Sequence, residues 1–180
     1  ASGGSIIVTA IEDASVMEAT PDTNINNVLN LKEQSDDNRY VFLRFSVTGL
    51  SGKSVTSVKL QLTEHSSSGE GNTDFTVMNI SSGTWAESSV TWNNMPVAGT
   101  TAYGNFTGGM LTNGQVIEIS LYDLVNQDGT YQIVLIPTKT WNGDIAFESK
   151  ECATASKRPQ LIIDYTDPLI VTSSEDAYIM

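Results

Sequence analysis

His65 is the only histidine in the sequence, and three serines follow it directly. Nucleophilic catalysis by serine needs an imidazole base and a carboxylate that orients it. The run from His65 to Gly69 is polar and typical of a loop, so we expect a solvated, mobile imidazole there. Spacings typical of a nucleophile elbow, a phosphate loop, a dinucleotide site or a zinc site are absent. The sequence therefore predicts a protein that is not an enzyme, although a glycosidase-type carboxylate pair has no fixed spacing and stays open.

Binding of Ca²⁺ is a second chemistry that the residue types allow. Oxygen ligands are frequent near the beginning of the chain, at Asp13, Asp22, Asn24, Asp36 and Asp37. Ca²⁺ takes about six to eight oxygen ligands, but the spacing here does not match an EF-hand loop. Polar turns and strand ends use the same residue types. The sequence therefore leaves a structural calcium ion and an ordinary set of turns as alternatives.

The basic residues are scarce and unevenly placed, which favours a third chemistry, the binding of anionic groups. Six of the nine lie in two segments, namely Lys32, Arg39, Arg44, Lys150, Lys157 and Arg158. If the leucines and phenylalanine beside them face a core, strand alternation turns Lys32, Arg44 and Lys150 outward. A patch of this kind could hold carboxylate or sulfate groups, with arginine doing so through two hydrogen bonds. The alternative is that these cations neutralise nearby acids on a solvated sheet.

Aromatic side chains would be needed to stack against sugar rings. Trp141 lies in a turn beside Asn142 and Gly143, so it is the better exposed candidate. Tyr40 shares a strand face with Arg44 and could stack as well, unless a loop or second sheet covers it. Trp85 and Trp92 are expected in the core.

The overall charge excludes several classes of partner. The chain of 180 residues has a formal net charge of −12, which opposes binding to nucleic acid and to anionic membranes. No apolar run reaches the about 18 residues of a membrane span. Cys152 is the only cysteine, so an internal disulfide is excluded.

Alternation with a period of two residues is the dominant pattern, and it predicts an all-β fold. In the segment 39–47, Val41, Leu43 and Phe45 share one face and Tyr40 and Arg44 the other. Other expected strands are 5–9, 14–17, 28–33, 57–63, 75–80, 115–120, 131–137, 145–149 and 161–165. About ten strands separated by turns predict a two-sheet β-sandwich of jelly-roll type. One short helical turn is expected at 121–126.

Residues 171–180 repeat the pattern of residues 8–17, with six identical positions at an offset of 163. Self-similarity at a fixed spacing is typical of tandem arrays. We therefore expect one domain over residues 1–167, followed by a linker and the start of a further repeat at 168–180. Chance similarity of two short β segments is the alternative.

Several blocks of the sequence resemble a known family. They are Ala19–Asn24, Leu31–Lys32, Arg39–Phe45, Val58–Leu62, Thr84–Trp85, Ser89–Pro96, Phe147–Glu151 and Arg158–Tyr165, and they run in order across nearly the whole chain. Together they resemble the DNRLRE-type domain, which is also classed as carbohydrate-binding module family 96. The resemblance implies a jelly-roll β-sandwich that is attached to secreted bacterial or archaeal proteins. Some such domains are similar to modules that bind alginate, and others belong to surface proteins with no known ligand.

The combined expectation is a monomeric, non-catalytic module of a secreted or cell-surface bacterial protein. It would bind an anionic polysaccharide, such as an alginate-like polyuronate or a sulfated glycan, and would adjoin other domains of the same chain. The alternative is a structural or adhesive repeat of a bacterial surface protein that has no specific glycan. A clustered basic patch with an exposed aromatic side chain would favour the first alternative.

Overall fold

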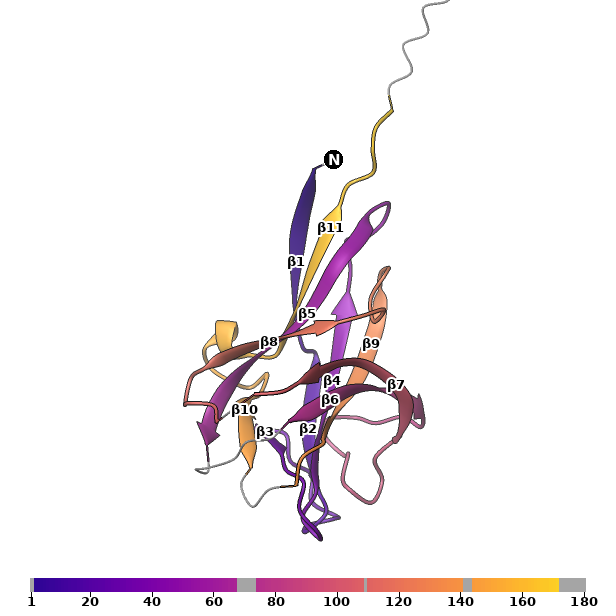
Figure 1. Cartoon of the computed structure of the whole chain (residues 1–180). Coiled ribbons are helices and arrows are strands. Elements are labelled where there is room, and N and C mark those ends of the chain that lie inside the picture. The colour runs from indigo at the N-terminus through magenta and orange to yellow at the C-terminus, as the bar shows by residue number, and fades with distance from the viewer. Residues whose placement is uncertain (1, 68–73, 109, 141–143, 172–180) are drawn as a thin grey trace, which may run out of the picture.

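Two antiparallel sheets packed face to face form a β-sandwich, which confirms the predicted all-β class (Figure 1). The structure is a computed structural model that describes residues 2–67, 74–108, 110–140 and 144–171. The first sheet contains β1 (Gly3–Thr9), β11 (Gln160–Thr166), β5 (Ser54–Ser67), β10 (Ile145–Glu148) and β3 (Val28–Leu31) in that order, and β8 (Val116–Leu121) also pairs with β5. The second sheet is ordered β2 (Glu12–Met17), β4 (Arg39–Val47), β9 (Gly129–Pro137), β6 (Phe75–Ser82) and β7 (Val97–Phe106).

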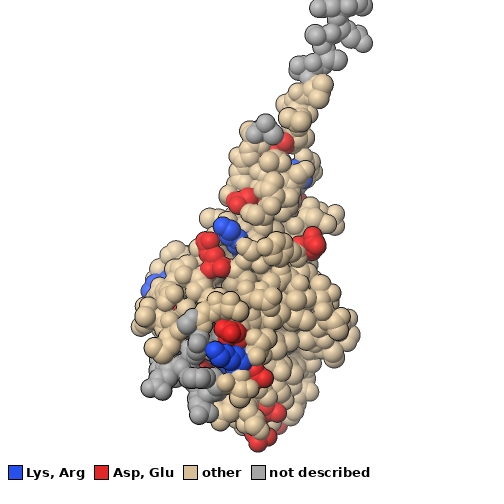
Figure 2. Space-filling view, viewed as in Figure 1, with Lys and Arg blue, Asp and Glu red and all other residues tan. Residues whose placement is uncertain are grey.

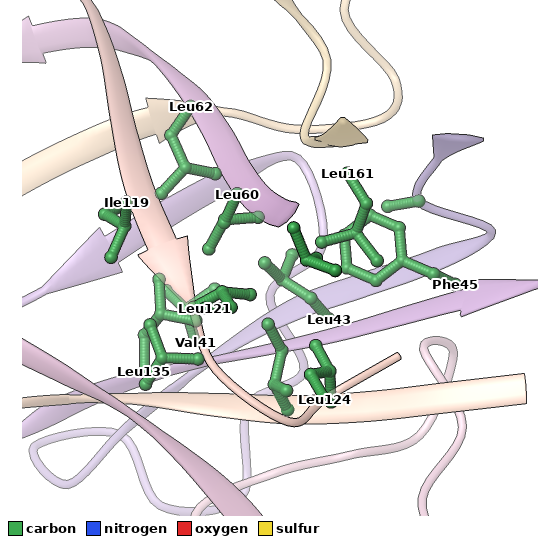
Figure 3. Packing of buried hydrophobic residues seen from close by; sticks show 14 of the residues in the cluster. Val41, Leu43, Phe45, Leu60, Leu62, Ile119, Leu121, Leu124, Leu135 and Leu161 are labelled. Atoms are coloured by element: carbon green, nitrogen blue, oxygen red, sulfur yellow. The ribbon is translucent and has the colours of Figure 1, made fainter. Parts of the chain in front are cut away.

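The main core lies between the two sheets and follows the predicted alternation. Val41, Leu43 and Phe45 of β4 are fully buried and meet leucines of β5, β8 and β11 (Figure 3). Strand β9 lies between β4 and β6, and Ile133, Val134 and Leu135 are all buried. It is therefore covered on both faces, as its continuous apolar run predicts.

A second, smaller core covers the outer face of the five-stranded sheet. The segment of residues 83–96, here called the covering segment, connects β6 to β7 and packs onto this face. Its Trp85 and Val90 contact Phe42 and Val134, whose side chains point away from the main core. Both faces of this sheet are therefore partly shielded from solvent, whereas each sheet of a sandwich normally exposes its outer face.

Two local predictions are wrong. The segment 121–126 is not helical: Leu121 ends β8, and Asp123 has a φ of 60°, which a right-handed helix does not allow. The one helix of the described chain is the short 3₁₀ turn η1 (Ala155–Lys157). His65 does not lie in a loop but near the end of strand β5.

Strand β7 was not predicted, because its residues do not alternate regularly between apolar and polar types. It contains two glycines and several small polar residues, and its pairing with β6 is interrupted by register shifts. Trp141 and most of the predicted repeat, residues 172–180, lie outside the described residues.

The two ends of the described chain leave the sandwich at the same end (Figure 1). Strands β1 and β11 pair over seven residue pairs, from Gly3 with Thr166 to Thr9 with Gln160. Beyond them, the backbone N–H of Asp167 donates to the carbonyl oxygen of Ser2 at 2.8 Å. Among the described residues, no helix is long and apolar enough to cross a membrane.

Candidate functional site

Lys32 and Arg39, predicted to bind anionic groups, are brought together but are held by carboxylates. Lys32 Nζ lies 2.6 Å from an oxygen of Asp37, and Arg39 contacts Asp37 at 2.9 Å and Asp144 at 2.8 Å. Burial alone would raise the pKa of Asp37, but the hydrogen bonds from Arg39 and Lys32 hold it below the usual value. A polymer carboxylate would have to compete with these carboxylates for the two cations.

Arg44 lies under the covering segment. Its guanidinium carbon is 4.4 Å from the centre of the Trp85 ring, and Nη2 donates to the carbonyl oxygen of Trp85 at 2.8 Å. Nη1 pairs with Glu12, and desolvation lowers the pKa of the guanidinium. Arg44 therefore attaches the covering segment to the sheet through a cation–π contact and a hydrogen bond to Trp85, while its ion pair with Glu12 joins β4 to β2 within the sheet.

Lys150 lies within a cluster of acidic residues, here called the acidic cluster: Asp13, Glu87 and Glu151. One oxygen of each carboxylate lies within 4.8 Å of the others, so the cluster could hold a metal ion. The Lys150 ammonium contacts Glu87 at 3.0 Å and also Glu151, and its backbone N–H donates to Asp13 Oδ2 at 2.7 Å. Asp13 is fully buried, and its Oδ1 has no hydrogen-bond partner.

The environment of Asp13 is costly for a carboxylate. Desolvation raises the pKa of Asp13 from 3.8 to about 7. The hydrogen bond from the Lys150 backbone lowers this pKa, whereas the charges of Glu151 and Glu87 raise it further. The acidic cluster therefore has more negative charge than its own cation compensates.

Of the predicted metal ligands, only Asp13 belongs to this cluster. Asn24 uses its amide to donate to the carbonyl oxygens of Glu87 and Val90, and Asp22 accepts from Asn93. Asp37 is occupied by Lys32 and Arg39, and Asp36 is exposed with a φ of 64°. The two remaining members, Glu87 and Glu151, are distant from Asp13 and from each other in the sequence, so their spacing did not predict a shared metal site.

The other predicted binding residues lie apart from these. Lys157 is exposed at the end of η1, and the adjacent Arg158 donates from Nε to the carbonyl oxygen of Cys152 at 2.8 Å. Tyr40 lies partly buried against Trp92, with ring centres 5.0 Å apart. On the face drawn in Figure 2, the described Lys and Arg residues are interleaved with Asp and Glu and form no continuous basic area.

A groove of about 650 Å³, here called the Tyr122 groove, lies between the beginning of β5 and the end of β8. Its polar lining includes Lys53, Ser57, Ser120, Tyr122, Asp123 and Asn126. Tyr122 is 71 % exposed, and a second hollow of about 420 Å³ shares Ser120 and Tyr122 with the groove. The aromatic ring therefore borders two adjoining hollows.

Lys53 provides a cation in this groove. Its ammonium lies 4.0 Å from the centre of the Tyr165 ring and forms no ion pair with any described carboxylate. The groove was not predicted from the sequence, because Lys53 precedes β5 and Tyr122 follows β8, in separate connecting segments. The one available signal was that Tyr122, directly after β8, continues the outward positions of that strand's alternation.

His65 lies among acidic residues. Its Nδ1 lies 3.0 Å from Glu148 Oε2, and the neighbouring Glu64 is 1 % exposed, with neither carboxylate oxygen hydrogen-bonded. Desolvation raises the pKa of Glu64, the charge of His65 opposes this, and the charge of Glu148 adds to it.

The raised pKa of Glu64 predicts a pH-dependent stability. The folded state holds the Glu64 proton more tightly than the unfolded state, so stability falls as the pH rises above the ordinary value of 4.5. We expect Glu64→Gln to stabilise the protein by roughly 1–3 kcal/mol at pH 8, with the gain shrinking toward pH 4. Urea unfolding at both pH values measures it, with the exposed Glu118→Gln as control. A Glu64→Gln protein that is less stable at pH 8 would contradict this.

Comparison with known proteins gives two findings. A profile of carbohydrate-binding module family 96 matches residues 5–165. The chain is also 24 % identical over 176 residues to a protein from Bacillus sp named gellan lyase, covering 93 % of this chain. The chain spans only 7 % of the length of that relative.

Proposed function

The chain belongs to carbohydrate-binding module family 96, and on this basis we propose that it binds an anionic polysaccharide in the Tyr122 groove. The module itself performs no chemistry and holds an attached enzyme or cell on the polymer. The observation that carries the proposal is the family match over residues 5–165. The relative named gellan lyase supports an anionic polysaccharide as the ligand and a secreted or cell-surface bacterial protein as the host.

The groove has the features that a sugar chain needs. Tyr122 offers an exposed ring face for stacking, and Ser57, Ser120 and Asn126 offer hydrogen-bonding groups along the lining. Lys53 supplies a cation that no described carboxylate neutralises, so it is free to pair with an acidic group of the polymer.

The charge of the protein also restricts the polymer. With a net charge of −12, a densely charged polyanion meets long-range repulsion that one lysine does not offset. Asp123, which also lines the groove, adds to that repulsion. We therefore propose a sparsely charged, gellan-like polymer in preference to a densely charged polyuronate such as alginate.

The basic residues predicted from the sequence form a second candidate surface. Lys157 and Arg158 are adjacent and form no ion pair with a described carboxylate, so they are the members of that set best able to bind an anion. Lys32, Arg39, Arg44 and Lys150 would first have to leave their carboxylate partners.

We also propose Ca²⁺ as the resident ion of the module. The acidic cluster offers carboxylate oxygens, which Ca²⁺ prefers, and no sulfur or imidazole ligand.

Affinity electrophoresis tests the proposed ligand. We expect gellan in the gel to retard the protein strongly, alginate and pectin to retard it less, and neutral glucans to leave its mobility unchanged. Added salt should narrow the difference between gellan and alginate, because it screens the long-range repulsion that disfavours the more densely charged polymer. Unchanged mobility with every anionic polymer would exclude the proposal.

A further inference from the structure

The charges around Asp13 do not balance. Four acidic residues are linked here. The Glu87 carboxylate accepts from the backbone N–H of Asp13, and the backbone N–H of Glu87 donates to the Glu12 carboxylate. The Lys150 ammonium contacts both Glu87 and Glu151. Two cations, Arg44 and Lys150, pair with them. When Asp13 is ionised, as it would be with a bound cation, four negative and two positive groups leave an excess of two negative charges, one of them on a fully buried side chain.

The orphaned oxygen of Asp13 indicates where a compensating ligand belongs. Buried carboxylate oxygens normally accept hydrogen bonds, and an unmatched one is costly. Asp13 Oδ2 accepts from the Lys150 backbone, whereas Oδ1 is buried without a partner. The backbone N–H of Asp13 donates to Glu87 at 3.2 Å, so the two carboxylates are next to one another.

We propose that the acidic cluster binds one Ca²⁺ through Asp13, Glu87 and Glu151, and that the ion clamps the covering segment to the edge of the sandwich. This rests on the calcium proposed above as the resident ion. A single divalent ion matches the excess of two charges and gives Asp13 Oδ1 its missing partner. Three carboxylates with additional water provide the about six to eight oxygens that Ca²⁺ takes.

The three ligands come from three parts of the chain. Asp13 lies on the edge strand β2, Glu87 on the covering segment, and Glu151 just after β10. Glu151 is 45 % exposed and Glu87 17 %, so the ion has access from solvent. Lys150, whose side chain is 22 % exposed, can turn outward when the ion binds. The clamp therefore joins both sheets and the covering segment at one point.

Calcium binding is measured on the whole chain by isothermal titration and by Tb³⁺ luminescence excited through tryptophan, with Trp85 only two residues from Glu87. We expect one ion per chain, and an unfolding temperature about 5–10 °C higher at a hundredfold excess over Kd than in EDTA. Mg²⁺ should give a smaller rise, because it demands a tighter octahedral geometry. Absence of calcium binding would overturn the proposal.

Variants locate the ion. Asp13→Asn and the exposed Glu151→Gln should both remove the calcium-dependent rise, whereas Glu118→Gln, on the outer side of β8, should retain it. Asp13→Asn should also be as stable as the parent protein in EDTA or more so, because it buries no charge. A calcium-dependent rise that persists in both cluster variants would place the ion elsewhere and overturn this site.

Hydrogen exchange tests the clamp itself. Calcium should slow exchange in residues 84–92 at least tenfold in the parent protein and leave it unchanged in Glu151→Gln. Calcium binding without this protection would overturn the clamp. Polysaccharide retardation is measured separately in EDTA, because the Tyr122 groove shares no residue with the acidic cluster, so either proposal can fail alone.

Discussion

Replacing Trp85 with alanine is expected to destabilise the fold by about 3–5 kcal/mol, the range for large aromatic side chains in a core. Trp85 is 7 % exposed and packs against Phe42, with ring centres 5.6 Å apart. Its Nε1 donates to Gln132 at 3.1 Å, and its ring lies beside the Arg44 guanidinium. The variant removes all these contacts at once and leaves Arg44 over a cavity.

Urea unfolding followed by circular dichroism measures this loss. Trp92→Ala is the matched control, because Trp92 lies on the same covering segment but is only partly buried, against Tyr40. We expect it to lose roughly half as much stability or less. Equal losses in the two variants would show that the covering segment contributes as a whole and not through the contacts of Trp85.

The second large effect is expected on binding. Tyr122→Ala should weaken binding to gellan about 10- to 30-fold, or about 1.4–2 kcal/mol, as is usual for a central aromatic contact. Because Tyr122 is 71 % exposed, its removal should change the free energy of unfolding by less than about 0.5 kcal/mol. Titration calorimetry and urea unfolding of the same samples separate the two effects.

Val116→Ala is the control for this experiment. Val116 is 53 % exposed and lies on the same outward face of β8, away from the groove. A double variant of Lys157 and Arg158 to alanine tests the second surface. If that double variant loses binding and Tyr122→Ala does not, the binding site is the surface predicted from the sequence and not the groove.

The sandwich could be predicted from the sequence because alternation is a local property. Val41, Leu43 and Phe45 alternate with polar or aromatic residues, and the register of β4 follows from which of them must be buried. Even β9 was recognisable from its continuous apolar run. The family blocks lie in these same regular elements, and the match to family 96 confirms that resemblance.

The site could not be predicted in the same way, because it depends on contacts between distant segments. Alternation places Arg44 on the outer face of its sheet, but nothing local shows that residues 83–96 fold over that face and bring Trp85 onto the guanidinium. Similarly, Asp13, Glu87 and Glu151 meet only after β2, the covering segment and the turn after β10 are assembled. Acidic partners of Lys32 and Arg39 include Asp144, more than a hundred residues away.

The pairing of β1 with β11 determines how the module responds to mechanical load. Tension applied between Ser2 and Asp167 pulls the two strands apart from one end, so the seven residue pairs would open one after another, like a zipper, starting at Gly3 and Thr166. Strands loaded in this way separate at lower force than strands that must slide past one another. We therefore expect the module, when it is stretched through these two points, to open first at this ladder, while the groove and the core of the sandwich stay intact.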